Sequence, residues 1–351
     1  MKKRLILSLV ILFSIFLAGL LIYNYKVSTP VSREAQDVAF VIESGAGAKK
    51  IGADLAQANL IKSEFFFKFY LWKNNLSAEL KAGEYVLSPS LSIKEIVKVL
   101  STGDSSSKER TIKLIEGWNT KDFATYFETE EMFKADDFLA LSGYPKIDYR
   151  QNTKYPNLID YSVDYDFLKD KPSYRGLEGY LFPDTYRIFV DATADEIIRK
   201  MLNNFDAKLT PDLRAEIEKQ DKTIYEIVTM ASIIQKEVRN EKDMKIVSGI
   251  FWNRIKNGQA LESCATLAYV LGENKKQYTY EDTRIESPYN CYLNRGLPPG
   301  PIANPGIEAI KAAIYPEDTN YNYFLSSFET GETIYSRTFE EHVRNKEKYL
   351  R

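Results

Sequence analysis

The stretch TIYEIVTMASIIQKEV, residues 223–238, predicts an amphipathic helix, because its apolar residues recur three and four positions apart. The apolar face runs through Ile227, Met230 and Ile234. The next position on that face holds a carboxylic acid, Glu237. The pattern therefore predicts a glutamate that faces the core of the fold.

A carboxyl group that is partly removed from water favours its protonated form, so we expect the pKa of Glu237 to lie above the usual value of about 4.3. Glu241 follows one turn later and, as a like charge, is expected to raise that pKa further. A protonated glutamic acid at the edge of an apolar pocket suits proton donation to a glycosidic bond. In the alternative interpretation Glu237 turns outward and pairs with Lys236 or Arg239, and the pattern alone favours this alternative.

Other segments of the second half also show clear secondary-structure patterns. Residues 194–205 and 243–258 predict amphipathic helices, and residues 321–336 predict a hairpin. The last helix is predicted to start at the capping box formed by Thr338 and Glu341. The single histidine, His342, follows directly, and its position favours a structural or exposed side chain over a catalytic one.

The chain is predicted to divide into an N-terminal segment and two α+β parts. Residues 38–103 show the order strand, helix, helix, strand, helix, and form a small α+β module. Residues 104–351 form a larger mixed α+β domain. Within it, residues 128–175 have little periodicity and are expected to run over the surface, with some helix around 132–139. Asn304 and Pro305 are expected to open a helix as its cap and first residue.

The N-terminus carries a basic and apolar pattern. Three basic residues, Lys2 to Arg4, precede a run from Leu5 to Tyr23 that is apolar except for two serines. A helix of this length just spans a hydrocarbon core of about 30 Å. We therefore expect residues 1–26 to be a single-pass transmembrane anchor with a cytoplasmic N-terminus, residues 27–37 to be a linker, and the rest to lie outside the cytoplasm. A cleaved signal peptide is the alternative.

Composition excludes several classes of function. The 47 basic and 49 acidic residues nearly balance, so the chain is not expected to bind nucleic acid. One histidine and two cysteines are too few for a zinc finger or a histidine-rich metal site, and we expect neither a metal nor a cofactor. A Ser-His-Asp triad would require His342.

Five motifs together resemble one known family. They occur in the order and approximate spacing of the endolytic murein transglycosylases, the MltG or YceG-like family. The motifs are GLEGYLFPDTY (176–186), ASIIQKEV (231–238), SGIFWNRI with a glycine at 258 (248–258), SPYNCY (287–292) and GLPPGPIANPG (296–306). The resemblance covers about residues 38–350 and implies a membrane anchor and a LysM-like module at 38–103, with LKAGEY and EIVKVLSTG as its clearest residues.

The resemblance implies a reaction on peptidoglycan. Glu237 corresponds to the catalytic acid of the family, which cleaves the β-1,4 bond between N-acetylmuramic acid and N-acetylglucosamine without water and leaves a 1,6-anhydro end. The expected partners are nascent glycan strands, the lipid bilayer and peptidoglycan synthases. Glu178 is the candidate second carboxylate, and Tyr180, Tyr289 and Asn290 are candidate sugar contacts, with packing and turn capping as their alternative roles.

Two departures from the family pattern bear on activity. Gln235 stands where the family usually has glutamate, and ESCAT (262–266) stands where a Q-T/S-D-P-T run is common. Cys264 and Cys291 are hypothesised to form a disulfide, as two cysteines outside the cytoplasm allow. The alternatives to the enzyme are a wall-binding or scaffold protein with an impaired site, and a hydrolytic muramidase.

Overall fold

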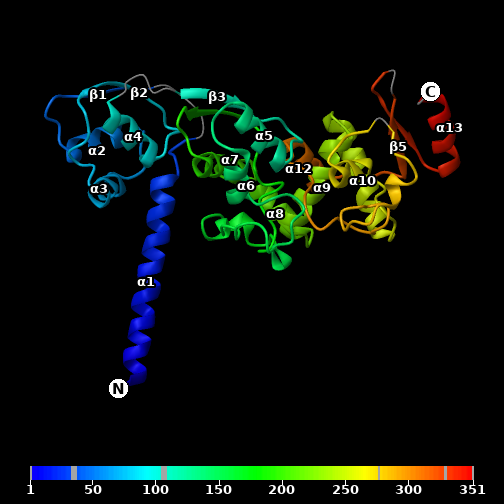
Figure 1. The fold of residues 1–351 in the computed structure, drawn as a ribbon, viewed down its shortest axis with the longest axis horizontal. Coiled ribbons are helices and arrows are strands. Elements are labelled where there is room, and N and C mark those ends of the chain that lie inside the picture. Colours follow the sequence, from blue (N-terminus) through cyan, green and yellow to red (C-terminus); the bar gives the residue numbers. More distant parts are fainter. Residues whose placement is uncertain (1, 33–37, 104–108, 276, 328–329, 350–351) are drawn as a thin grey trace. The chain divides into compact units, whose positions relative to one another are not determined.

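The computed structural model describes residues 2–32, 38–103, 109–275, 277–327 and 330–349. The chain forms two compact units (Figure 1). The first consists of Met1–Thr111 with Arg187–Val190, and the second of Ile112–Tyr186 with Asp191–Arg351. Helices and small two-stranded sheets alternate in both units, which confirms the predicted mixed α+β class.

The first unit is built on one antiparallel strand pair. Strand β1 (Val38–Ile42) pairs with β2 (Gly83–Leu87), and Phe40 lies opposite Tyr85. Helices α2 (Ala48–Gln57), α3 (Glu64–Lys73) and α4 (Ile93–Thr102) belong to the same unit. Its core is apolar, with Leu55 and Leu100 fully buried. The LysM-like character of residues 38–103 stays a prediction.

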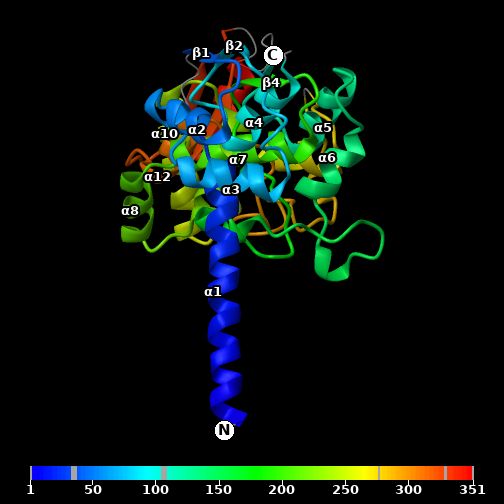
Figure 2. The same ribbon diagram turned by 90° about the vertical axis from the view of Figure 1, so that its left-hand side faces the viewer.

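Helix α1 (Lys2–Ser28) also belongs to the first unit, and its C-terminal end is packed (Figure 2). Val27 is fully buried, and the ring of Tyr23 meets Phe69 edge-on at 5.2 Å. Among the residues that the structure describes, no helix meets the length and apolar character required of a membrane span. The predicted linker 27–37 begins inside α1, and residues 33–37 lie outside the described residues.

The second unit is mainly helical. Its helices are α5 (Thr120–Thr129), α6 (Ala135–Ser142), α7 (Ala194–Lys208), α8 (Pro211–Lys219), α9 (Ile224–Glu237), α10 (Glu241–Lys256), α11 (Cys264–Leu271), α12 (Ile307–Ile314) and α13 (Phe339–Tyr349), with short 3₁₀ helices η1 (Tyr149–Gln151), η2 (Tyr161–Val163), η3 (Asp166–Leu168) and η4 (Asp282–Arg284). Strands β5 (Tyr323–Ser326) and β6 (Thr333–Ser336) form the predicted hairpin. A further strand pair, β3 (Glu109–Lys113) with β4 (Thr185–Phe189), does not belong to the second unit alone, because Arg187–Val190 and the chain up to Thr111 are counted with the first.

Helix α9 forms the centre of the second unit. It starts at a capping box in which Thr223 and Glu226 bind each other's backbone N–H groups. It packs against α12 and α10, and its side chains from Ile227 to Ile234 are buried. On α10, a Cβ atom at Gly249 would lie 2.1 Å from the carbonyl oxygen of Glu317, so only glycine permits this close approach. The helix predicted at 223–238 is therefore a buried helix against which other helices of the second unit pack.

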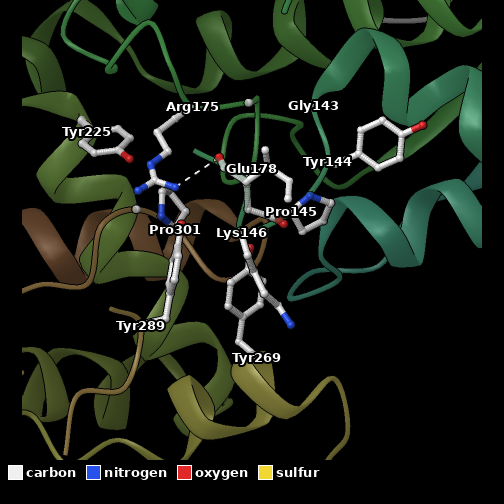
Figure 3. A pocket seen from close by; sticks show the side chains of 13 residues that line it. Gly143, Tyr144, Pro145, Lys146, Arg175, Glu178, Tyr225, Tyr269, Tyr289 and Pro301 are labelled. Carbon is white, nitrogen blue, oxygen red and sulfur yellow. Dashed lines mark hydrogen bonds between the residues drawn. The ribbon is translucent and has the colours of Figure 1, made fainter. Parts of the chain in front are cut away.

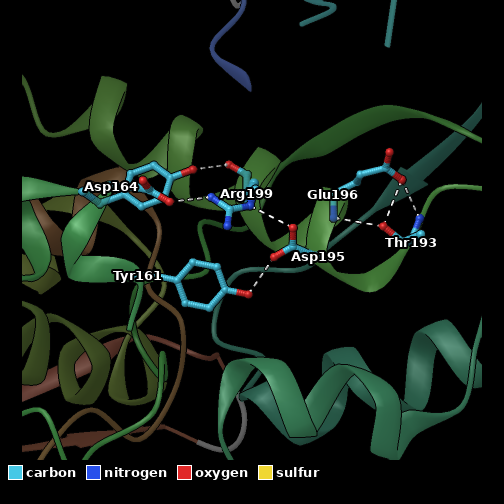
Figure 4. A network of polar contacts seen from close by, with 7 residues as sticks. Tyr161, Asp164, Thr193, Asp195, Glu196 and Arg199 are labelled. Atoms are coloured by element: carbon cyan, nitrogen blue, oxygen red, sulfur yellow. Dashed lines mark hydrogen bonds and ion pairs between the residues drawn. The ribbon is translucent and has the colours of Figure 1, made fainter. Parts of the chain in front are cut away.

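Residues 128–175, which were expected to run over the surface, are mostly exposed or half-buried, but a few buried side chains anchor the segment. Phe138, Tyr161 and Phe167 are buried in the second unit. The segment is also held to α7: the guanidinium of Arg199 contacts Asp164 and Asp195 at 2.8 Å each, and the hydroxyl of Tyr161 donates to Asp195 at 2.9 Å (Figure 4). Short 3₁₀ turns replace long elements here, so the apolar residues are irregularly spaced and no period marks them as buried.

Two smaller expectations also require correction. The helical part of this segment is α6 (Ala135–Ser142), a few residues later than predicted. Asn304 does not cap a helix: α12 begins after Gly306, which is its N-cap. The Asn304 side chain instead accepts from the N–H groups of Gly179 and Leu181, at 2.9 and 3.0 Å, and joins two of the quoted motifs.

Candidate active site

Glu237 is the last residue of α9. The helix ends there because Val238 adopts an extended conformation with φ of −142°. Glu241 consequently does not continue the same helix: it begins α10 and pairs with Lys245 at 2.6 Å. The expectation that Glu241 raises the pKa of Glu237 is therefore wrong, since the chain turns between the two residues.

One carboxylate oxygen of Glu237 is held by the start of α11. The hydroxyl of Ser263 donates to Oε1 at 2.5 Å, and the backbone N–H of Ala265 donates to the same atom at 3.3 Å. Ser263 is the N-cap residue of α11, so the carboxylate lies at the positive end of a helix dipole. Within the described residues Oε2 accepts no hydrogen bond, which leaves this oxygen available to a ligand.

The pKa of Glu237 is raised, as the apolar stripe predicted. Burial of the carboxyl group is the largest cause; the Ser263 hydroxyl, the Ala265 N–H and the charge of Arg254 act in the opposite direction. The alternative in which Glu237 turns outward is not observed, because Lys236 instead donates to the Gly117 carbonyl at 3.2 Å. Glu237 thus combines a stabilised carboxylate with a preference for the protonated form, as an acid that must lose and regain a proton requires.

Glu237 lines an open cleft of about 600 Å³. Aromatic side chains make up much of its wall, a composition suited to the faces of pyranose rings. The lining residues are Glu237, Arg254, Leu261, Glu262, Cys264, Lys275, Gln277, Tyr278, Thr279, Tyr280, Thr283, Tyr292, Tyr323, Phe324, Leu325, Ser326, Phe339, His342 and Lys346. We call this the catalytic cleft.

A second carboxylate, Glu262, lines the catalytic cleft and was missed by the sequence analysis. Its Oε2 lies 3.8 Å from the Arg254 guanidinium, which donates to the carbonyls of Leu261 and Asn322. The backbone of Glu262 has a positive φ of 49°, a conformation that non-glycine residues rarely adopt. In the sequence, the feature that could have drawn attention to Glu262 was the departure of residues 262–266 from the family pattern.

The histidine also lies in this cleft. The His342 ring stacks on Tyr323 with the ring centroids 5.2 Å apart, and burial lowers its pKa. Its Nδ1 atom is buried without a hydrogen-bond partner in the described part of the chain. The packing matches the structural role that the sequence favoured, but the location brings the ring to the cleft that holds Glu237.

Glu178 does not line the catalytic cleft. It borders a separate cavity of about 20 Å³ with Arg175, Tyr269 and Tyr289 (Figure 3). The hydrogen bond drawn there from Arg175 goes to the carbonyl of Ile147. Glu178 Oε1 accepts from the Thr120 N–H and from Asn304, each at 3.0 Å, and burial raises its pKa to about 8. This carboxyl group supports the fold and is wrongly placed to act across a sugar from Glu237.

The three candidate sugar contacts are packed or capping residues instead. Tyr180 is fully buried, with its ring centroid 5.3 Å from that of Phe205. Asn290 is also fully buried and donates to the carbonyls of Thr283 and Ile285. Tyr289 is 5% exposed and borders the small cavity of Figure 3. Their alternative roles, packing and turn capping, are what the structure shows, since buried side chains have no room for a pyranose.

The proposed disulfide is absent: Cys264 and Cys291 are both free thiols. Cys264 lines the catalytic cleft with its sulfur 3.2 Å from the Tyr292 hydroxyl, whereas Cys291 is buried. Cys264 therefore contacts Tyr292, the residue directly after Cys291, and not Cys291 itself. The described residues contain no group of three or more His, Cys, Asp and Glu placed to hold a metal ion.

The fold and the cleft define a class of protein: a mixed α+β enzyme with an aromatic cleft and a carboxylic acid at its edge. The chain belongs to the YceG-like family, whose sequence model matches residues 40–348. It is 30% identical to the endolytic murein transglycosylase of Bacillus subtilis, over 96% of this chain and 91% of that protein.

Two further relatives extend the comparison. The endolytic murein transglycosylase of Streptococcus pneumoniae serotype 2 is 31% identical over 96% of this chain, which spans 64% of that longer protein. A crystal structure of a yceG-like protein from Listeria monocytogenes is similar with a TM-score of 0.56 and 33% identity, over 89% of this chain and all of that one.

Proposed function

We propose that this chain is a lytic transglycosylase that cleaves the β-1,4 bond after N-acetylmuramic acid in peptidoglycan. Membership of the YceG-like family and the names of the curated relatives support this class of enzyme. The observation that carries the residue assignment is the Glu237 carboxyl group, which lines a cleft of about 600 Å³ with Oε2 unbound among the described residues.

In this mechanism Glu237 acts first as an acid and then as a base. The protonated carboxyl group donates its proton to the glycosidic oxygen as the bond to the leaving sugar breaks. The resulting carboxylate, stabilised by the Ser263 hydroxyl and the Ala265 N–H, then accepts the proton of the C6 hydroxyl as the 1,6-anhydro ring closes. One carboxyl group serves both steps, so the reaction does not require a second carboxylate.

The direct test is digestion of purified peptidoglycan by the full chain in detergent, with product masses read by mass spectrometry. We expect fragments that end in 1,6-anhydro-N-acetylmuramic acid and the appearance of internal cleavage products. Release of fragments with ordinary reducing ends would contradict the transglycosylase. The absence of any release would favour the wall-binding or scaffold alternative.

Glu262 supports a hydrolytic muramidase as the second candidate. A hydrolase normally uses two carboxyl groups that flank the bond, and Glu262 shares the catalytic cleft with Glu237. If Glu262 activates a water molecule, the Glu262→Gln variant loses all release. If it only holds Arg254, as the 3.8 Å contact favours, the variant keeps releasing anhydro ends. The same mass spectra therefore separate the two reactions.

We further propose that residues 1–26 anchor the chain in the membrane with its catalytic unit outside the cytoplasm, where nascent glycan strands and peptidoglycan synthases are expected partners. The support is the apolar run from Leu5 to Tyr23 behind three basic residues. The full chain is expected in the membrane fraction after extraction with carbonate, and a chain without residues 1–26 in the supernatant. Equal recovery of both chains in the supernatant would contradict the anchor.

A further inference from the structure

A second cleft has a volume of about 220 Å³. Two of its lining residues are direct sequence neighbours of residues that line the catalytic cleft. Lys236 of α9 and Ala265 of α11 line this second cleft, whereas the adjoining residues Glu237 and Cys264 line the catalytic cleft. The two clefts therefore meet the same last turn of α9 and the same first turn of α11. A ligand in the second cleft would be close to a sugar bound at Glu237.

Three lysines from separate segments line this second cleft: Lys121 on α5, Lys146 in the loop after α6, and Lys236 on α9. We call it the lysine cleft. The Lys146 ammonium donates to the Val270 carbonyl at 3.1 Å, and the Lys236 ammonium to the Gly117 carbonyl. Among the residues that the structure describes, the ammonium groups of Lys146 and Lys236 therefore contact neutral carbonyl oxygens and not carboxylates.

The lysine cleft also contains two acidic residues, Asp122 and Glu273. Asp122 accepts from the Asn119 N–H at 2.9 Å as part of the capping box of α5. Glu273 lies 3.6 Å from Lys275. A hydrogen bond from a neutral N–H leaves the negative charge of Asp122 in place, so the three lysines exceed the two carboxylates of the lining by one positive charge.

Lys146 is affected by the positive charge of a neighbouring lysine. Desolvation is the main cause of its lowered pKa, and repulsion by Lys121 contributes. Its backbone has a positive φ of 67°, in the left-handed region that favours glycine. A bound anion would relieve the repulsion between Lys146 and Lys121.

We propose that the lysine cleft binds the carboxylates of the stem peptide on the muramic acid next to the cleaved bond. This inference rests on the proposed function, because it assumes peptidoglycan as the substrate. In strands that carry peptides, the lactyl carboxyl group of muramic acid is joined to the peptide as an amide, so the backbone sugars carry no charge. The stem peptide itself carries several carboxylates. Flexible lysines, unlike a planar arginine fork, can follow carboxylates at variable positions along a peptide. The lysine cleft is thus the peptide subsite beside the sugar subsites of the catalytic cleft.

The test compares glycan strands that carry stem peptides with the same strands after an amidase has removed the peptides and the lactyl carboxyl groups so exposed have been converted to methylamides. The full chain in detergent is assayed beside Lys121→Gln, Lys236→Gln and the Lys121→Gln/Lys146→Gln double variant. Lys256→Gln is the matched control, since this exposed lysine of α10 lines neither cleft. We expect the double variant to lose about tenfold in kcat/KM on peptide-bearing strands through a higher KM, with no change on peptide-free strands.

Each other outcome overturns the inference. An equal loss on both substrates means that the lysines serve the sugars or the fold, and unchanged kinetics in all variants means that they bind nothing in this reaction. Stronger competition from polyglycerol phosphate than from a muramyl pentapeptide, lost in the variants, would assign the cleft to a phosphate polymer.

Failure of the proposed function gives a different pattern. If the wild-type chain cleaves neither substrate, the transglycosylase assignment fails. Titration calorimetry with a soluble muramyl pentapeptide then tests the lysine cleft alone. Binding to the wild type and to Lys256→Gln but not to the double variant supports the inference, and equal binding to all chains overturns it.

Discussion

Replacement of Glu237 by glutamine is expected to lower kcat/KM for peptidoglycan cleavage by about 10³-fold, which corresponds to roughly 4 kcal/mol of transition-state stabilisation. Glutamine has the same shape and can still accept from Ser263 and Ala265 through its amide oxygen. It cannot donate a proton to a leaving oxygen or accept one from a hydroxyl. Release of anhydro ends, measured by mass spectrometry over a fixed time, is the readout.

Ser263→Ala is the matched variant, because it alters the environment of the acid and leaves the acid in place. The Ser263 hydroxyl lowers the pKa of Glu237, so its removal is expected to raise that pKa and shift the alkaline limb of the pH–rate profile to higher pH. The rate should fall far less than in Glu237→Gln. Full activity of Glu237→Gln, with an unchanged melting temperature, would mean that another residue of the catalytic cleft is the proton donor.

The helix that carries Glu237 was predictable because periodicity reports burial along a regular element. Its end was not predictable in the same way. The extended conformation of Val238 separates Glu237 from Glu241, and no glycine or proline marks that turn. The same limit applies to residues 128–175, where the buried aromatic residues Tyr161 and Phe167 lie on 3₁₀ turns without a regular period.

The cleft itself required the tertiary structure. Ser263 and Glu262 come from a segment after α10, and Tyr323 and His342 from the C-terminal hairpin and helix, so no spacing in the sequence relates them to Glu237. The family motifs led to Glu237 as the proposed acid, but several of their other polar residues support the fold. The presence of a glutamate in a family motif therefore does not show that it contacts substrate. Its presence in the lining of the cleft is the stronger indication.

Glu178 illustrates this distinction. Its Oε1 receives hydrogen bonds from Thr120 and Asn304, and Asn304 in turn accepts from the N–H groups of Gly179 and Leu181. The carboxyl group thus links the GLEGYLF motif, the start of α5 and the loop before α12. Its Oε2 atom and the Tyr269 hydroxyl are buried, and neither has a partner at ordinary hydrogen-bond geometry among the described residues. Burial of this kind favours the neutral acid, which agrees with its raised pKa.

This protonated carboxyl group is expected to make the protein less stable as pH rises. The pKa of Glu178 is about 8 in the folded chain and 4.5 as its ordinary value, so between these values the folded state holds a proton that the unfolded state has released. The free energy of unfolding from this group should therefore fall with pH across that window, by up to about 1.4 kcal/mol per pH unit. The stabilisation is fully present below pH 4.5 and is lost as pH rises through 8.

The Glu178→Gln variant tests this expectation, since glutamine keeps the acceptor for Thr120 and Asn304 and does not titrate. From pH 5 to pH 8 we expect the unfolding free energy of the wild type to fall by a few kcal/mol relative to that of the variant, because only the wild type carries the titrating carboxyl group. Chemical denaturation of both chains at each pH measures that difference and cancels the groups that they share. Glu178→Ala should instead lose about 2 kcal/mol or more at every pH, because the Thr120 N–H and the Asn304 amide are left without their acceptor. If the difference in unfolding free energy between wild type and Glu178→Gln stays constant with pH, Glu178 is ionised in the folded protein. Its negative charge would then require a cationic partner. Among the residues that line the cavity of Figure 3, only a rearranged Arg175 or Lys146 can supply one.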